Sequence, residues 1–226
     1  MQVSIVLYEG FTALDVAGPF EVLHHLPDAQ VSFVSSTPGM IQADAAPFAL
    51  EAQDLDAVPD PQVLLVPGGN GTQAQLADER LLAWLRRVHE TTQWTTAVCT
   101  GSMLLGAAGL LEGRPATTHW YELPSLAVFG AEPRTARIVE SGRIITCAGV
   151  SAGVDMALYL CGRIAGDALA ECVQLGIEYD PEPPYDSGSL AKASDDVEEL
   201  VRAVFRESYG PPYAEVAASL SQPRAR

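Results

Sequence analysis

A cysteine stands between a short apolar run and a helical pattern in "WTTAVCTGSMLLGAA", residues 94–108. The run at 94–98 predicts a buried strand, and the apolar residues after Gly101 predict a helix. Cys99 is then expected at a helix N-terminus, where the helix dipole and unpaired N–H groups favour the thiolate and lower the pKa of the thiol. Gly101 removes a side chain where such a turn is tightest. The pattern indicates a nucleophilic cysteine, although a cysteine in an apolar segment is also an ordinary small core residue.

Cys147 is a second candidate for the nucleophile. It ends the apolar run 143–149, which is joined to the run 134–141 by a Ser-Gly pair. This pair of runs predicts a β-hairpin beside the main sheet. Because an elbow at the centre of a parallel sheet is less expected on a hairpin strand, we favour Cys99 and keep Cys147 open.

Two other segments place polar groups just after predicted strands. Asp15 lies among apolar residues, and desolvation raises the pKa of a carboxyl group toward the range used in acid-base catalysis; alternatively it caps a helix. The segment "PGGNG", 67–71, aims backbone N–H groups at an anion or simply makes a tight turn. Ligands bind outside the carboxyl ends of the strands in an open parallel sheet, so we expect both segments to lie near Cys99.

The four histidines show no metal-binding spacing such as HxH or HExxH, and we expect no metal. His24 and His25 are adjacent, so on a helix they point to different faces and are not expected to form one site. His119 lies beside Thr118 and Trp120 and is either a structural residue or a neighbour of the site.

Strand and helix patterns alternate along the chain. The predicted strands are 3–8, 31–36, 63–69, 94–98, 134–141 and 143–149, and the clearest helical patterns are 13–26, 79–90 and 194–208. This order predicts a three-layer α/β sandwich around a mainly parallel sheet. We expect one α/β domain over residues 1–185 and a C-terminal helical extension over 186–226, whose apolar stripe packs on the domain or on a partner subunit.

The amino-acid composition limits the kinds of molecule that the protein is expected to bind. The 226 residues carry 29 Asp and Glu against 13 Lys and Arg, a formal net charge of −16, which repels nucleic acid and anionic membranes. The sequence shows neither a hydrophobic leader nor an apolar run of the roughly 20 residues that a membrane span needs. The four cysteines are too few and too widely spaced for a disulfide scaffold. We therefore expect a soluble, cytoplasmic protein with reduced thiols and a small-molecule ligand.

Four segments in this order resemble the ThiJ/PfpI superfamily, and within it the isonitrile (isocyanide) hydratase branch. They are "LDVAGPFEVL", "VPGGNG", "AVCTGSMLLGAAGLLEGRPATTHW" and "GVSAGVDMALYL", and the resemblance runs over about residues 2–185. It implies a flavodoxin-like sandwich, a homodimer and a cysteine at a strained elbow between strand and helix.

The resemblance also implies the roles of site residues. It makes Cys99 the nucleophile, Asp15 the acid and Thr100 the residue that orients Asp15 or water. The backbone N–H groups of Gly69 and Thr100 would form a polar pocket, and Gly68, Asn70 and His119 are possible neighbours. The implied reaction is the hydration of an isonitrile with an apolar substituent to an N-substituted formamide, without cofactor or metal.

Other branches of the superfamily provide the alternatives. The peptidase branch has a histidine where Thr100 stands, so that a Cys-His pair lacks its base here. The branch linked to dicarbonyl detoxification has a glutamate where Asp15 stands, which weakens that interpretation without excluding it. Transcription regulators use a similar domain before a DNA-binding module of about a hundred residues, whereas 47 residues follow Tyr179 in this chain. A stand-alone redox or small-molecule sensor stays possible, because a reactive cysteine is readily oxidised.

Overall fold

The computed structural model of the chain describes residues 1–209 and Tyr213. The strands are β1 Gln2–Val6, β2 Gln30–Ser35, β3 Gly39–Gln42, β4 Ala49–Asp54, β5 Val63–Val66, β6 Trp94–Val98, β7 Pro115–Ala116, β8 Glu132–Pro133, β9 Ile138–Ser141 and β10 Ile144–Cys147. The α-helices are α1 Ala13–Leu23, α2 Thr72–Gln75, α3 Glu79–Thr91, α4 Gly101–Ala107, α5 Ala152–Ala165, α6 Asp167–Gly176 and α7 Asp195–Tyr209. Short 3-10 helices lie at Leu55–Ala57 and Trp120–Phe129.

Eight strands form one sheet in the order β3-β4-β2-β1-β5-β6-β10-β9. The pairs from β4 to β10 are parallel, while β3 and β9 run antiparallel to their neighbours at the two edges. β5 and the last four residues of β6 are wholly buried, as expected for central strands covered on both faces. The carboxyl ends of β1, β5, β6 and β10 therefore meet along one edge of the sheet.

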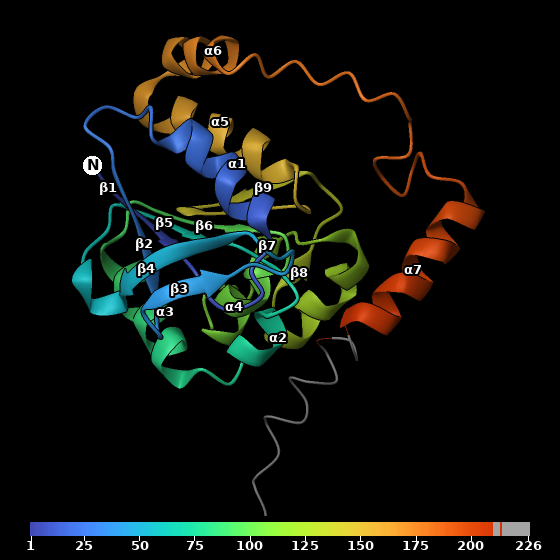
Figure 1. The fold of residues 1–226 in the computed structure, drawn as a ribbon, viewed down its shortest axis with the longest axis horizontal. Helices are drawn as coiled ribbons and strands as arrows, with labels where there is room; N and C mark the ends of the chain where they lie inside the picture. The colour runs from blue at the N-terminus through green and yellow to red at the C-terminus, as the bar shows by residue number, and fades with distance from the viewer. Residues whose placement is uncertain (210–212, 214–226) are drawn as a thin grey trace, which may run out of the picture.

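Helices cover both faces of this sheet, with α1, α5 and α6 on one side and α2, α3 and α4 on the other (Figure 1). In α3, every buried side chain comes from one apolar face, which comprises Leu81, Leu82, Trp84, Leu85 and Val88. The three layers confirm the fold expected from the alternating sequence pattern, a flavodoxin-like α/β sandwich.

The predicted hairpin is present, but its position differs from the prediction. β9 and β10 pair antiparallel around a turn at Gly142 and Arg143, one residue after the predicted Ser-Gly turn, and β10 also pairs in parallel with β6. The hairpin is thus an edge of the main sheet rather than an addition beside it. Strand propensity and the turn residues predict the hairpin, but pairing with β6 depends on contacts across some fifty residues of sequence.

The C-terminal part leaves the α/β layers after α6, crosses the surface as an extended chain and ends in α7 on another side of the molecule (Figure 1). The apolar stripe of α7 is only partly covered: Phe205 is half-buried, but Leu200 is 66% and Val204 49% exposed. None of the helices in the described part of the chain has the length and apolar character needed to cross a membrane.

Candidate active site

Cys99 occupies a sharp turn between β6 and α4. Its φ is +55°, a left-handed backbone conformation that residues with a Cβ rarely adopt. Thr118 Oγ1 donates a hydrogen bond to the Cys99 carbonyl oxygen at 2.8 Å, and the Cys99 N–H donates to Ala148 O at 3.2 Å. A Cβ at Gly101 would collide with the carbonyl oxygen of Val66 in β5, the strand beside β6, so only glycine fits at this position. The surrounding fold holds this strained turn, as it does in a nucleophile elbow.

The Cys99 side chain lies among backbone N–H donors. The N–H groups of Thr100 and Val150 hydrogen-bond to its sulfur and favour the thiolate. Val150, with a φ of +44°, belongs to the loop after β10. The elbow and this loop therefore face the sulfur from two neighbouring strands.

Asp15 lies in the first turn of α1 and is fully buried. It does not cap the helix: Thr12 is the N-cap residue, and Asp15 Oδ2 accepts a hydrogen bond from the Gly68 N–H at 2.8 Å. A Cβ at Gly68 would lie 2.5 Å from Thr100 N, so the turn after β5 can reach both the carboxyl group and the elbow only as glycine. The other oxygen, Oδ1, has no hydrogen-bonding nitrogen or oxygen in the described residues, and the Cys99 thiol interacts with the carboxyl group.

The pKa values of these two residues are coupled. Burial raises the pKa of Asp15 to about 7, while the Gly68 N–H and the Cys99 thiol lower it. Burial also raises the pKa of Cys99 well above its ordinary value, and the negative charge of Asp15 raises it further. The prediction of a lowered cysteine pKa was therefore wrong, because desolvation outweighs the N–H donors at the helix start. Cys99 is a thiol in the resting site, and the Asp15 carboxyl group interacts with it.

A chain of hydroxyl groups fixes Thr100. Thr72 Oγ1 donates to Gly69 O at 2.8 Å and lies 3.0 Å from Thr100 Oγ1. Either hydroxyl can be the donor between Thr72 and Thr100, because Tyr8 and Tyr213 also hydrogen-bond to this group. Thr100 Oγ1 in turn accepts from the Gly69 N–H at 3.1 Å. The Gly69 N–H is thus directed at Thr100, and the Thr100 N–H at the sulfur.

A pocket of about 90 Å³ opens beside the thiol. Its lining residues are Thr12, Gly69, Cys99, Thr100, His119, Tyr121, Glu122, Val150, Phe205 and Tyr213. Aromatic side chains and Val150 form much of this surface, and its polar residues include Thr100 at the elbow and Thr12 and Glu122 away from it. The pocket can receive a small, largely apolar molecule with one reactive end at the thiol.

Tyr213 is a pocket residue that the sequence analysis missed. Its side chain is 2% exposed, and its hydroxyl hydrogen-bonds with Thr100 and Thr72. Its backbone N–H donates to the carboxylate of Glu122, which also accepts from Ser125 Oγ at 2.6 Å. Tyr213 carries no motif in the sequence, and the only available signal was the apolar stripe of the preceding helix.

The remaining predicted neighbours occupy different positions. His119 lines the pocket, and its Nδ1 accepts from the Tyr121 N–H at 3.3 Å. Burial lowers the pKa of His119 to about 4, so it is neutral near pH 7. Asn70 is exposed and does not line the pocket. Cys147 is fully buried at the end of β10 and is not a lining residue either.

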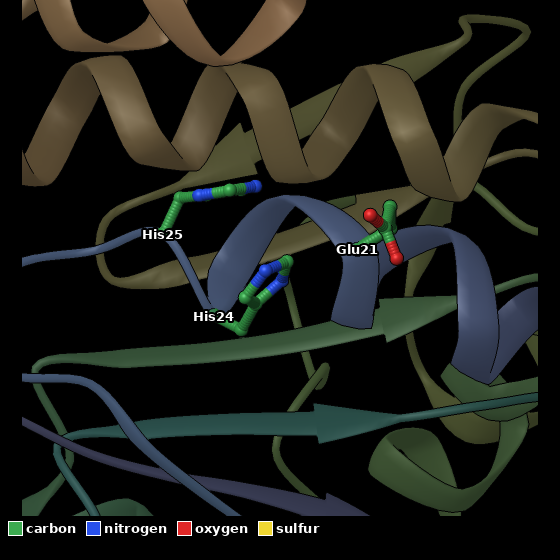
Figure 2. A group of neighbouring side chains, drawn as sticks. All are labelled: Glu21, His24 and His25. Atoms are coloured by element: carbon green, nitrogen blue, oxygen red, sulfur yellow. The ribbon is translucent and has the colours of Figure 1, made fainter. Parts of the chain in front are cut away.

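His24 and His25 lie together, contrary to the sequence prediction. Their ring centres are 3.9 Å apart, and one ligand atom from each of Glu21, His24 and His25 lies within 4.8 Å of the other two (Figure 2). His24 is the C-cap residue of α1 and His25 follows it in a turn, so the helix does not continue through the pair and set the direction of both side chains. All three side chains are exposed and could hold a metal ion at the surface, outside the Cys99 pocket.

The arrangement of Cys99, Asp15 and the glycine turn can be compared with known proteins. The sequence pattern of the DJ-1/PfpI family matches residues 1–162. The chain belongs to the DJ-1/PfpI family. The protein named isonitrile hydratase from Pseudomonas putida is 39% identical over 189 residues, which cover 84% of this chain and 83% of that protein.

Two further proteins are similar to this chain, one a solved structure and one a transcriptional regulator. The crystal structure of a ThiJ/PfpI family protein from Pseudomonas syringae superposes with a TM-score of 0.91 at 35% identity, covering 96% of this chain and 90% of the other. The transcriptional regulator CdhR from Pseudomonas aeruginosa is 36% identical over 98 residues, which cover 40% of this chain and 27% of the regulator.

Proposed function

We propose that the protein is a hydro-lyase that converts isonitriles to N-substituted formamides, with Cys99 as nucleophile and Asp15 as the acid and base. The observation that carries the proposal is the buried Asp15 carboxyl group, with a pKa of about 7, interacting with the Cys99 thiol beside a largely apolar pocket. The similarity to the isonitrile hydratase of Pseudomonas putida supports the same reaction. An isonitrile fits the site because its electrophilic terminal carbon can meet the Cys99 thiol while its substituent occupies the apolar part of the pocket.

The first half of the reaction forms a covalent intermediate. The Asp15 carboxylate takes the proton of the Cys99 thiol, and the sulfur forms a bond to the terminal carbon of the isonitrile. Asp15 then returns the proton to that carbon. The product is a thioimidate, in which the carbon carries sulfur, hydrogen and a double bond to nitrogen, and Asp15 is again a carboxylate.

The second half releases the product. The Asp15 carboxylate takes a proton from water as the water oxygen bonds to the thioimidate carbon, and this proton passes to the nitrogen. Collapse of the tetrahedral intermediate breaks the carbon–sulfur bond, and the hydroxyl proton returns to the thiolate. One isonitrile and one water thereby give one formamide, and the balance needs neither a cofactor nor a metal.

The neighbouring groups support these steps. The N–H groups of Thr100 and Val150, which hydrogen-bond to the sulfur, stabilise the thiolate as it forms and as it leaves. Thr100 is held by Gly69 and Thr72, so its N–H has a fixed direction. We assign Thr100 and Gly69 to positioning, with the Thr100 N–H facing the reacting atom.

The direct assay follows formamide formation by the purified protein with an alkyl and an aryl isonitrile. We expect turnover by the wild type and loss of turnover, to the rate without protein, in Cys99→Ala. Cys147→Ala is the matched control, since it removes a buried thiol on the neighbouring strand outside the pocket. Absence of turnover by the wild type, or unchanged turnover in Cys99→Ala, contradicts the proposal; parallel assays with methylglyoxal and a peptide test the other enzymatic activities.

We propose further that the enzyme is a cytoplasmic homodimer. Apolar side chains on the outside of α7, such as Leu200, are exposed in one chain and suit contact with a second copy. Sedimentation equilibrium should give twice the 24.0 kDa of one chain, and a monomer at micromolar concentration contradicts this part of the proposal.

A further inference from the structure

The C-terminal extension forms one wall of the pocket beside Cys99. Phe205 from α7 and Tyr213 beyond it both line the pocket, although more than a hundred residues separate them from the elbow. The Phe205 ring packs against three consecutive aromatic residues, with centroid distances of 5.4 Å to His119, 5.9 Å to Trp120 and 5.3 Å to Tyr121. These contacts hold the ring at the pocket.

A cation strengthens the attachment of α7. The Arg202 guanidinium lies 4.9 Å from the ring centre of Trp120, on the same segment that Phe205 contacts. Glu198 accepts a hydrogen bond from Arg202 Nε at 2.7 Å and fixes the guanidinium. Arg202 and Phe205, which lie three residues apart on α7, therefore both contact Trp120.

Tyr213 is held at both ends. Its N–H donates to Glu122, and its hydroxyl hydrogen-bonds with Thr100 and Thr72, which belong to the hydroxyl chain at the elbow. With 2% of its side chain exposed, it closes the space next to Thr100. The wall is thus bonded to the same residue whose N–H faces the sulfur.

The space that this wall leaves is small. A dry cavity of roughly 150 Å³ accommodates a benzene ring, and one water takes up about 30 Å³ in the liquid. The pocket of about 90 Å³ is smaller than the first value and must also admit the isonitrile group itself. A compact alkyl substituent fits this space, whereas an aryl ring must extend toward the opening of the pocket or displace Phe205 or Tyr213.

We propose that Phe205 and Tyr213 determine specificity by restricting the pocket at Cys99 to compact aliphatic substituents, so that the preferred substrates are small alkyl isonitriles. This inference rests on the proposed function for the identity of the reacting group. The size limit itself is a property of the pocket and can be tested with any electrophile that reaches the thiol.

The first experiment compares kcat/KM for isopropyl isonitrile and phenyl isonitrile in the wild type, Phe205→Ala and Val204→Ala. Val204 is the matched control because it is the neighbouring residue on α7, is 49% exposed and does not line the pocket. The wild type should prefer the isopropyl compound. Phe205→Ala should raise the phenyl-to-isopropyl ratio by about tenfold or more, the scale expected when a hydrophobic pocket gains space, and Val204→Ala should leave the ratio unchanged. A wild-type preference for the phenyl compound, or an unchanged ratio in Phe205→Ala, overturns the inference.

The second experiment does not depend on isonitrile turnover. Iodoacetamide and its N-phenyl derivative carry the same reactive group, and peptide mass spectrometry gives their rates of reaction with Cys99. Cys172 is exposed and serves in the same sample as the reference for intrinsic reactivity. The rate at Cys99 is divided by the rate at Cys172 for each reagent. In the wild type this relative rate should be higher for iodoacetamide than for its N-phenyl derivative. Phe205→Ala should reduce the ratio of the two relative rates by about fivefold or more.

Tyr213→Phe distinguishes the steric effect of the Tyr213 ring from the effect of its hydroxyl group. The ring remains, so the discrimination between the two iodoacetamides should stay within about twofold of the wild type. Discrimination at Cys99 without any isonitrile turnover upholds the size limit while the proposed function fails. Equal relative rates for both reagents in the wild type overturn the size limit even if isonitriles are hydrated.

Discussion

Asp15 Oδ2 accepts a hydrogen bond from the Gly68 backbone N–H at 2.8 Å, which ties the first turn of α1 to the turn after β5. This bond orients a carboxyl group that interacts with the Cys99 thiol and whose pKa is raised by burial and further by the negative charge of Asp44. One N–H partly offsets the cost of burying the charge, so the carboxyl group titrates near neutral pH instead of near pH 4. The proton transfer that we propose between Asp15 and Cys99 depends on this position.

The pH dependence of turnover should follow the Asp15–Cys99 pair. Burial raises the Asp15 pKa to about 7, and the proposed reaction starts with Asp15 as a carboxylate and Cys99 as a thiol. The value of kcat/KM should therefore rise with pH through an apparent pKa near 7 that belongs to the pair. A profile measured from pH 5 to 9 checks this, and a flat profile over that range contradicts the role of Asp15.

Asp15→Asn should abolish catalysis while stabilising the fold at alkaline pH. The free carboxyl group in the unfolded chain ionises near pH 4, whereas the folded protein retains its proton up to about pH 7. The wild type therefore loses stability as pH rises from about 4 to about 7, by up to roughly 4 kcal/mol, and the asparagine variant does not. Asparagine still accepts from the Gly68 N–H. Urea unfolding of both proteins at pH 5 and pH 8 measures the effect. A difference in unfolding free energy in favour of the variant that is smaller at pH 8 than at pH 5 contradicts the prediction.

Replacing Cys99 tests the backbone strain at the elbow. A left-handed conformation costs an L-residue roughly 1–2 kcal/mol, and glycine adopts it without this cost, although glycine also loses more entropy on folding. Cys99→Gly should thus be more stable than Cys99→Ala by up to about 1 kcal/mol. The comparison uses thermal or denaturant unfolding of the two inactive variants. A more stable alanine variant contradicts the strained elbow.

Thr100→Val should disturb the site more than Thr100→Ser. Valine leaves the Gly69 N–H without its acceptor and removes the hydroxyl that contacts Thr72, at a cost of about 1–3 kcal/mol in unfolding free energy. Serine keeps the oxygen and should retain most of the stability and turnover. If both variants have the same kcat and stability, the hydroxyl chain does not position the elbow.

The elbow was predictable from sequence because its signals are local. An apolar run, Cys99 and Gly101 follow one another within a few residues, and each type suits one part of a strand-turn-helix. The hairpin around Gly142 was predictable for the same reason. Its place inside the main sheet was not, since pairing of β10 with β6 depends on contacts between distant segments.

The properties that control the reactivity of the site could not be predicted from the local sequence, because they depend on contacts between distant segments. Asp15 and Gly68 lie 53 residues apart, and the pattern around Asp15 showed an apolar neighbourhood without showing which donor it meets. The direction of the Cys99 pKa was predicted wrongly because helix position is visible in sequence, but depth of burial is set by tertiary packing. Tyr213 was missed for that reason too, since nothing around it in the sequence connects it with Thr100.

The measurement that tests the central claim most directly is rapid acid quenching of the wild type with one equivalent of an alkyl isonitrile, followed by mass spectrometry of the Cys99 peptide. Cysteine addition predicts a transient increase equal to the whole mass of the isonitrile, located at Cys99 and decaying at the rate of formamide release. Formamide formation at the full rate with Cys99 unmodified at every time point, or in Cys99→Ala, contradicts covalent catalysis by this residue.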